Sequence, residues 1–230
     1  MLDQIFRNMT PVVKNLLILN VLFYLATYVL ASKGIDLVNL LSSRHYSNPD
    51  FQPYQLVTSM FMHLSFSHIF MNMIGLLIFG GILEKHWGSK KFLIFYFFSG
   101  FSAEIVQVIY NMANFYYYTG TPFINSESLV PIEVSNIIGS LLYTRHLGAS
   151  GAIFGLSAAI FKYFPNSEWY LMFIPIPIKM KNLFPIMIVG SIYLVFYPMG
   201  MNIGHIAHLG GALGGFILVL IWQKDKRNFY

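Results

Sequence analysis

Long apolar runs separated by short polar segments dominate the hydrophobic pattern of this 230-residue chain. An α-helix needs about 20 mostly apolar residues to cross the hydrocarbon core of a bilayer. The pattern predicts six such helices, at about 12–31, 57–82, 91–113, 149–164, 183–200 and 203–222. The fourth and fifth are short or interrupted, so their ends are the least sharply defined. We therefore expect an all-α integral membrane protein, folded as one six-helix domain over residues 1–230.

The composition agrees with a membrane protein. Hydrophobic residues make up 56% of the chain and charged residues only 10%, whereas roughly 25% of a soluble globular domain is charged. The net charge is +5, but nucleic-acid binding needs a basic patch, and here the basic residues lie singly or in short clusters between apolar runs. We therefore expect no nucleic-acid partner. The absence of cysteine excludes disulfides, thiol nucleophiles and cysteine-ligated metals.

The positions of the basic residues predict the orientation of the bundle. If the odd-numbered helices run from inside to outside, only three of the 14 Lys and Arg residues fall in outer segments: Lys33, Arg44 and Arg145. Positive residues collect on the cytoplasmic side of membrane proteins, so we expect both termini to be cytoplasmic. Because organelle-targeting features are lacking, a bacterial cytoplasmic membrane is the expected location.

The connecting segments differ in character. We expect segment 33–56 to be an outer loop folded against the bundle, and segment 115–147 to be the longest outer connection. The latter begins with an interfacial aromatic belt at Tyr116–Tyr118, and near its end Ile137, Ile138, Leu141 and Leu142 have helical spacing. Segment 165–182 contains alternating prolines, which predict an extended cytoplasmic connection.

Two glycine-rich stretches carry the candidate chemistry. In the fourth predicted helix Gly151 and Gly155 are four residues apart and share one face, with Ser150 just before them. In the sixth helix one stripe holds Gly204, His208, Gly211 and Gly215. Small residues allow helices to approach closely in membranes. Taken alone, the first motif is explained more simply as a packing seam with an incidental serine; together, the two seams predict helices that dock and bring Ser150 to His208.

A serine beside an imidazole is typical of nucleophilic catalysis. A hydroxyl is a weak nucleophile until a neighbouring base accepts its proton, and the same base can later protonate the leaving amine. Phe154, one turn below Ser150, can support the His208 ring by stacking. No acidic residue accompanies either motif, so we predict a Ser150–His208 dyad. Glu104, in the third predicted helix, is expected to be a hydrogen-bonded structural acid that faces the bundle interior or water.

The second predicted helix carries a polar pair, His68 and Asn72, with i,i+4 spacing. Their side-chain donors, with the backbone N–H of Ser150, can stabilise the negative oxygen of a tetrahedral intermediate. Interhelical hydrogen bonding is the simpler explanation of the pair taken alone. His63 is about 140° from His68 on a helical wheel, so we expect it not to share this task.

The histidines also allow a metal-site interpretation. His205 and His208 are three residues apart, and zinc binds imidazole well. However, the chain contains no HExxH motif, and no carboxylate accompanies either histidine cluster. We therefore expect neither a metal nor a cofactor.

In these residues the chain resembles the rhomboid intramembrane serine proteases. Three motifs match in order and spacing: His68-xxx-Asn72, Gly148-x-Ser150-Gly151 and Ala207-His208-xx-Gly211-xxx-Gly215. The resemblance implies that Ser150 is the nucleophile and His208 the general base, with His68, Asn72 and the Ser150 amide forming the oxyanion site. It also implies that Glu84 ties the second helix to the third. The chain departs from the family at Tyr54-Gln55, where many relatives have Trp-Arg, and in its longer segment 115–147.

The resulting hypothesis is an intramembrane serine endopeptidase that cleaves transmembrane protein substrates near the outer leaflet, in contact with membrane lipids. Substrates are expected to enter beside the fifth helix, which Pro185 and Gly190 weaken. One alternative is a non-catalytic rhomboid-like protein that binds membrane helices for quality control. A small transporter is a second alternative, but it would show repeated halves or broken helices at the bilayer midplane. The sequence indicates no particular natural substrate or oligomeric state.

Overall fold

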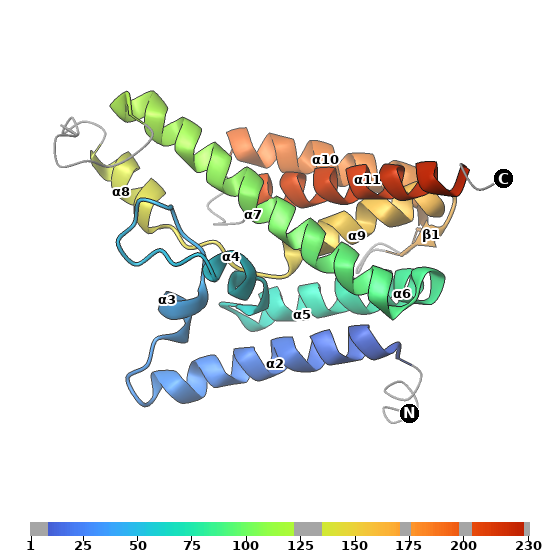
Figure 1. Cartoon of the computed structure of the whole chain (residues 1–230), viewed down its shortest axis with the longest axis horizontal. Helices are drawn as coiled ribbons and strands as arrows, with labels where there is room; N and C mark the ends of the chain where they lie inside the picture. Colours follow the sequence, from blue (N-terminus) through green and yellow to red (C-terminus); the bar gives the residue numbers. More distant parts are fainter. Residues whose placement is uncertain (1–8, 122–134, 171–175, 198–203, 228–230) are drawn as a thin grey trace.

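The computed structural model describes residues 9–121, 135–170, 176–197 and 204–227, which form a helical bundle (Figure 1). Its long helices are α2 (Pro11–Ala31), α7 (Ser89–Thr119), α9 (Ser150–Tyr163), α10 (Met180–Phe196) and α11 (His205–Arg227). A further helix runs through α5 (Phe66–Gly75), the π-helical η2 (Leu76–Gly80) and α6 (Gly81–Trp87). The shorter elements are α3 (Leu37–Leu41), α4 (Gln55–Thr58), the 3₁₀ turn η1 (Ser59–Phe61), α8 (Ser135–Tyr143), β1 (Glu168–Trp169) and β2 (Ile178–Lys179).

Four of these segments are long and apolar enough to cross a membrane within the described part of the chain: Pro11–Ala31, Phe66–Trp87, Ser89–Thr119 and His205–Lys224. The predicted spans at 149–164 and 183–200 correspond to α9 and α10, which have only 14 and 17 residues. The six-span count therefore stays a prediction. Residues 198–200 and 203, where two predicted spans end and begin, lie outside the described residues.

The predicted start of the second helix at residue 57 is wrong. The apolar run there belongs to α4 and η1, and the membrane helix begins only at Phe66. Ser65 is the residue that starts it, because its hydroxyl accepts a hydrogen bond from the His68 N–H at 3.2 Å. Hydropathy could not detect this break because apolar residues lie on both sides of it. The third helix was also predicted too short, and Tyr116–Tyr118 lie inside α7 rather than in a loop.

Helix α9 lies in the centre of the bundle, where it packs against α7, α11 and η2 (Figure 1). Its sequence is rich in glycine, alanine and serine, and most of its residues are buried. The predicted glycine seam joins it to α11, since a Cβ added to Gly211 would overlap the Gly151 carbonyl group. One turn further along, a Cβ on Gly215 would lie 2.7 Å from Gly155 Cα. These glycines let the two backbones touch.

Glu84 fastens one end of the bundle. Its Oε1 accepts hydrogen bonds from the Val12 N–H at 2.9 Å and the Ser89 hydroxyl at 2.7 Å, and its Oε2 accepts one from the Val13 N–H at 2.9 Å. The carboxylate therefore satisfies free N–H groups in the first turn of α2 and also contacts the start of α7. Glu84 therefore links α6 to α2 and to α7. The sequence predicted a link between the second and third helices, and the structure adds the link to the first.

The segment 33–56 folds against the bundle, as predicted. Gln55 is buried, and its amide Nε2 donates to the Leu40 carbonyl at 3.0 Å. At Tyr54-Gln55, where many relatives have Trp-Arg, this hydrogen bond helps to hold the loop in place. Ser43 pairs with His146 through two backbone hydrogen bonds of 3.0 and 2.7 Å. This pairing joins the segment to the connection that precedes α9.

The remaining connections agree in part with the sequence. The predicted helical stretch near residue 137 is α8, whereas residues 122–134 of the same connection lie outside the described residues. In segment 165–182 the strands β1 and β2 form an antiparallel pair, in keeping with the extended prediction. Ile174 and Pro175, which contributed to that prediction, also lie outside the described residues.

Candidate active site

Ser150 is the first residue of α9, at the end of a tightly held loop. The Gly148 N–H donates to the Ser59 carbonyl at 2.9 Å, and Gly148 has a φ of 118°, a conformation that favours glycine. The N–H groups in the first turn of a helix have no partner within that helix and carry its positive end. The loop therefore places a hydroxyl group directly beside N–H donors that suit a negative charge.

Ser150 and His208 lie in contact. The Ser150 Oγ and His208 Nε2 atoms are 2.8 Å apart, although the two residues belong to α9 and α11. The Phe154 ring stacks on the His208 imidazole with a centroid distance of 4.2 Å and an interplanar angle of 8°. No hydrogen bond joins His208 to a carboxyl group in the part of the chain that the structure describes. The pair has the geometry in which an imidazole can accept the proton of a hydroxyl group.

His68 and Asn72 face the loop that leads to Ser150. An added Cβ at Gly148 would lie 2.7 Å from His68 Nε2 and 3.5 Å from Asn72 Nδ2. Gly148 therefore serves two purposes, since it adopts a positive φ and leaves room for the His68 ring. The predicted polar pair therefore lies beside Gly148, two residues before Ser150.

His63 belongs to this group as well, contrary to the expectation from the helical wheel. It precedes α5, its ring lies 4.9 Å from that of His68, and its Nε2 is 2.8 Å from Asn72 Nδ2. Burial, reinforced by His68, lowers the pKa of His63 to about 4. The neutral ring can therefore accept one N–H of the Asn72 amide, and the second N–H has no partner in the described part of the chain. Only the break before Phe66, signalled by Ser65, could have revealed this role.

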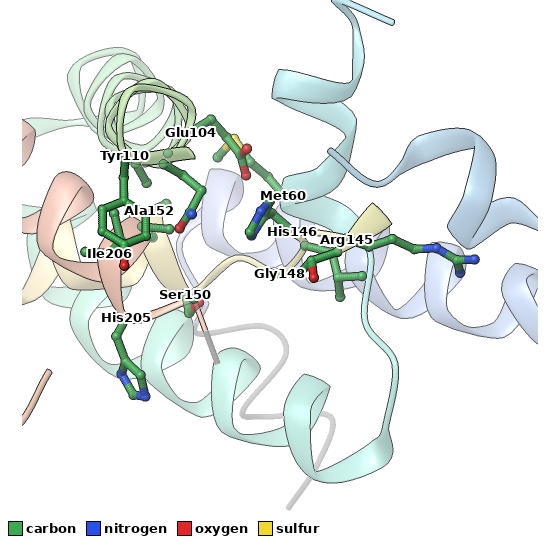
Figure 2. Close-up of a pocket in the computed structure, with 18 of the residues that line it drawn as sticks. Met60, Glu104, Tyr110, Arg145, His146, Gly148, Ser150, Ala152, His205 and Ile206 are labelled. Atoms are coloured by element: carbon green, nitrogen blue, oxygen red, sulfur yellow. The ribbon is translucent and has the colours of Figure 1, made fainter. Parts of the chain in front are cut away.

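A cavity of about 500 Å³ opens beside the dyad. Its lining includes Ser150, His205 and Glu104 (Figure 2). His68 and Gln107 also line it. Glu104 is buried and lines this cavity, which agrees with the expectation that it faces the bundle interior or water. Among the described residues, no three His, Asp or Glu side chains gather as a metal site.

One wall of the cavity, which includes Gln107 and His146, belongs to a chain of polar side chains that the sequence did not predict. Gln107 Nε2 donates to Asn111 Oδ1 at 2.9 Å, and Asn111 Nδ2 lies 3.2 Å from His146 Nε2. Burial, together with the nearby His45, lowers the pKa of His146 to about 4. The neutral His146 ring therefore accepts from the Asn111 amide. Gln107 and Asn111 share a face of α7 with i,i+4 spacing, which was the only sequence signal for this group.

The family model of the Rhomboid domain matches residues 50–224. The putative rhomboid protease YdcA of Bacillus subtilis is 24% identical over 227 residues, which cover 99% of this chain and 96% of that protein. Rhomboid protease GlpG of Haemophilus influenzae is 24% identical over 194 residues, or 84% and 82% of the two chains.

Other relatives are longer than this chain. RHOMBOID-like protein 12, mitochondrial, of Arabidopsis thaliana is 27% identical over 176 residues, which cover 76% of this chain and 47% of that protein. Rhomboid-like protease 3 of Toxoplasma gondii is 23% identical over 177 residues, or 76% and 54% of the two chains. The chain thus spans about half the length of these two curated relatives.

Proposed function

The chain belongs to the rhomboid family, and we propose that it is an intramembrane serine endopeptidase whose catalytic dyad is Ser150 and His208. The observation that carries the proposal is the 2.8 Å contact between Ser150 Oγ and His208 Nε2, with the imidazole stacked on Phe154. A hydroxyl held at this distance from a neutral imidazole is activated for attack on a carbonyl carbon. The protease names of relatives such as YdcA and GlpG support the same activity.

The steps of the proposed reaction depend on His208 as the proton acceptor. Ser150 Oγ attacks the scissile carbonyl carbon while His208 Nε2 takes the hydroxyl proton, and a tetrahedral intermediate forms. The C–N bond then breaks, His208 gives the proton to the leaving amine, and an acyl-enzyme remains on Ser150. Water, deprotonated by His208, attacks this ester, and the collapse of the second intermediate releases the carboxylic acid and restores the serine.

The oxyanion of each intermediate needs donors that are already in place. We assign this task to the Ser150 backbone N–H, His68 and the free N–H of the Asn72 amide. Two observations support the assignment: both side chains face Gly148 within a few ångströms, and His63 fixes the orientation of Asn72. The positive end of α9 acts in the same direction.

The length of α9 supports cleavage below the membrane surface. Its 14 residues extend about 21 Å, which is less than the roughly 30 Å of a hydrocarbon core. Lys162 in the last turn of α9 suits the cytoplasmic interface. If that end lies at the interface, Ser150 lies inside the outer leaflet. Water then reaches it through the cavity rather than from bulk solvent.

Transmembrane substrates are proposed to approach beside α10. This helix packs on α11 and α9, while its outward side chains, including Ile186, Val189 and Phe196, are largely exposed. Pro185 lies within α10 without ending it, although it removes one backbone hydrogen bond and so lowers the stability of the helix. An extended substrate backbone must leave the lipid for a protein-lined site before it is cut.

The proposal can be tested with the full chain in proteoliposomes that contain a model transmembrane substrate. The wild type should cleave the substrate and react with a fluorophosphonate probe, and Ser150→Ala should do neither. Ser157→Ala is the matched control, because Ser157 lies on the same helix and donates to the Phe154 carbonyl rather than to a histidine. Equal cleavage and labelling by Ser150→Ala and the wild type would remove Ser150 from the nucleophile role.

A non-catalytic protein that binds membrane helices gives a different outcome in the same experiment. Substrate would then co-purify with the wild type and with Ser150→Ala alike, and neither would release fragments. The hydrogen-bonded pair of Ser150 and His208 favours the protease, because helix binding alone does not need a hydroxyl activated by an imidazole.

A further inference from the structure

Four lysines lie at the end of the bundle that is predicted to face the cytoplasm. Lys85 belongs to the last turn of α6, Lys90 and Lys91 to the first turn of α7, and Lys162 to the last turn of α9. All four are exposed. Figure 1 shows these helix ends on the same side of the bundle as the C-terminus. We call these four residues the lysine cluster.

Aromatic contacts hold these helix ends against one another. The ring of Trp87 in α6 lies 5.7 Å from that of Tyr163 in α9 and 5.3 Å from that of Trp222 in α11, measured between centroids. The Lys91 ammonium group lies 5.5 Å from the centroid of the same Trp222 ring. The other three lysines are within three residues of Trp87 or Tyr163 in the chain. The positive-inside rule accounts for the side of the membrane on which lysines collect, but these contacts bring them to one place.

No carboxylate balances the lysine cluster within the described part of the chain. None of the four ammonium groups makes an ion pair there. Glu84, one residue before Lys85, is buried, and its two oxygens already accept three hydrogen bonds. Glu168 is exposed on β1 and also pairs with none of the four. The cluster therefore presents positive charge to its surroundings without a counter-charge from the described residues.

Arginines on the predicted outer side are arranged differently. Arg44 forms an ion pair with Asp50 at 3.1 Å, and Arg145 lies 3.9 Å from Asp36. These arginines have carboxylate partners within the chain, whereas anions for the lysine cluster must come from outside the described residues. The cytoplasmic leaflet is a source of such anions, because its anionic lipids give the membrane surface a negative potential.

We propose that the lysine cluster binds the phosphate headgroup of an anionic phospholipid in the cytoplasmic leaflet. Ammonium groups from three helices can donate hydrogen bonds to the phosphodiester oxygens, and the neighbouring aromatic rings suit the boundary between headgroups and acyl chains. A lipid held there joins the ends of α6, α7 and α9 and so stabilises the folded bundle. This inference goes beyond the proposed protease function and does not depend on Ser150; it depends on the orientation predicted from the lysines and arginines.

The test uses the full chain in uncharged detergent micelles at low salt. Added phosphatidylglycerol should raise the melting temperature by several degrees, whereas phosphatidylcholine, which has a phosphate but no net charge, should not. The triple variant Lys85→Gln, Lys90→Gln, Lys162→Gln should bind phosphatidylglycerol about a hundredfold more weakly, since each lysine near an anionic lipid surface contributes about fivefold. Lys33→Gln is the matched control, because Lys33 is an exposed lysine on the predicted outer side.

Three results would overturn the lipid site: equal stabilisation by the two lipids, an undiminished response of the triple variant, or an equal loss of response in Lys33→Gln. Sodium phosphate is tested alone, against sodium chloride of the same ionic strength. If it reproduces the effect of phosphatidylglycerol, the cluster binds free anions and the assignment to a lipid is wrong. Substrate cleavage is measured separately, so a protein that binds phosphatidylglycerol but cleaves nothing would remove the protease proposal and leave the lipid site intact.

Discussion

The Phe154 ring stacks on the His208 imidazole and so restricts the directions in which the imidazole can point. The two rings are nearly parallel, 8° apart, and in the proposed reaction the imidazole must keep its Nε2 toward Ser150 while its charge changes. We expect Phe154→Leu to keep an apolar contact, lose the stacking and lower kcat roughly tenfold with a smaller effect on KM. Steady-state cleavage of a detergent-solubilised substrate measures both constants.

Phe161→Leu provides the matched control for this substitution. Phe161 lies on the same helix and stacks on Phe184, away from the dyad. It should change thermal stability without lowering kcat by a comparable factor. An equal fall in kcat for both variants would show that the effect of Phe154 is general loss of packing.

Asn72 is expected to act on the transition state rather than on substrate binding. Its amide lies 2.8 Å from the His63 ring and, in the proposed mechanism, gives one hydrogen to His63 and the other to the oxyanion. Asn72→Leu should therefore lower kcat about a hundredfold and leave KM nearly unchanged. Asn114→Leu is the control, because among the described residues the Asn114 amide bonds to the Tyr110 carbonyl of its own helix and to no other group. A rise in KM with kcat intact would assign Asn72 to substrate binding instead.

At the level of the helices, the contact between α9 and α11 depends on glycine. A Cβ on Gly211 would overlap the Gly151 carbonyl group, so Gly211→Ala must push the two helices apart. We expect a stability loss of about 1–3 kcal/mol and a larger loss of activity, because the same seam carries Ser150 and His208. Thermal unfolding in detergent micelles and substrate cleavage measure the two effects.

Gly190→Ala tests whether any glycine in an apolar helix of this protein would respond in the same way. Gly190 lies in α10, and a Cβ added there would have no atom within 4 Å. Since alanine has the higher helix propensity, this variant should be neutral or slightly stabilised. Similar destabilisation of both variants would contradict the role of the seam.

The elements that could be predicted from the sequence are those with a local signal. The glycine spacing around Ser150 and His208 is such a signal, and it correctly predicted that α9 and α11 pack together. The break at Met62–Ser65 was missed because apolar residues flank it, although Ser65 is a recognisable helix start. His63 and His146 reach the site from loops, whose paths depend on tertiary contacts such as the Ser43–His146 pairing.

The folded protein is predicted to lose stability in acid because of His146, which lies in the connection before α9. Burial and the nearby His45 lower the pKa of His146 to about 4, against 6.5 in an unfolded chain. Below pH 6.5 the unfolded chain therefore binds a proton that the folded chain does not, and the unfolding free energy falls as the pH drops towards 4. The loss from His146 is on the order of 2–3 kcal/mol.

His146→Gln keeps an acceptor for Asn111 but removes this titration. Its melting temperature in micelles should fall several degrees less than that of the wild type between pH 7 and pH 4.5. His86→Gln, at an exposed position in α6, should fall as much as the wild type. Identical acid sensitivity of all three proteins would show that His146 does not control it.

At the scale of the whole molecule, the depth of the active site depends on which end of the bundle faces the cytoplasm. The distribution of Lys and Arg predicts cytoplasmic termini, and this orientation places Ser150 in the outer leaflet. The chain contains no cysteine, so single cysteines can be labelled without background. We expect Lys33→Cys to react with a membrane-impermeant maleimide in intact bacterial cells, and Lys162→Cys to react only after lysis. Both positions are exposed in the structure, so burial cannot produce the difference; labelling of Lys162→Cys alone in intact cells would invert the bundle and place the dyad in the inner leaflet.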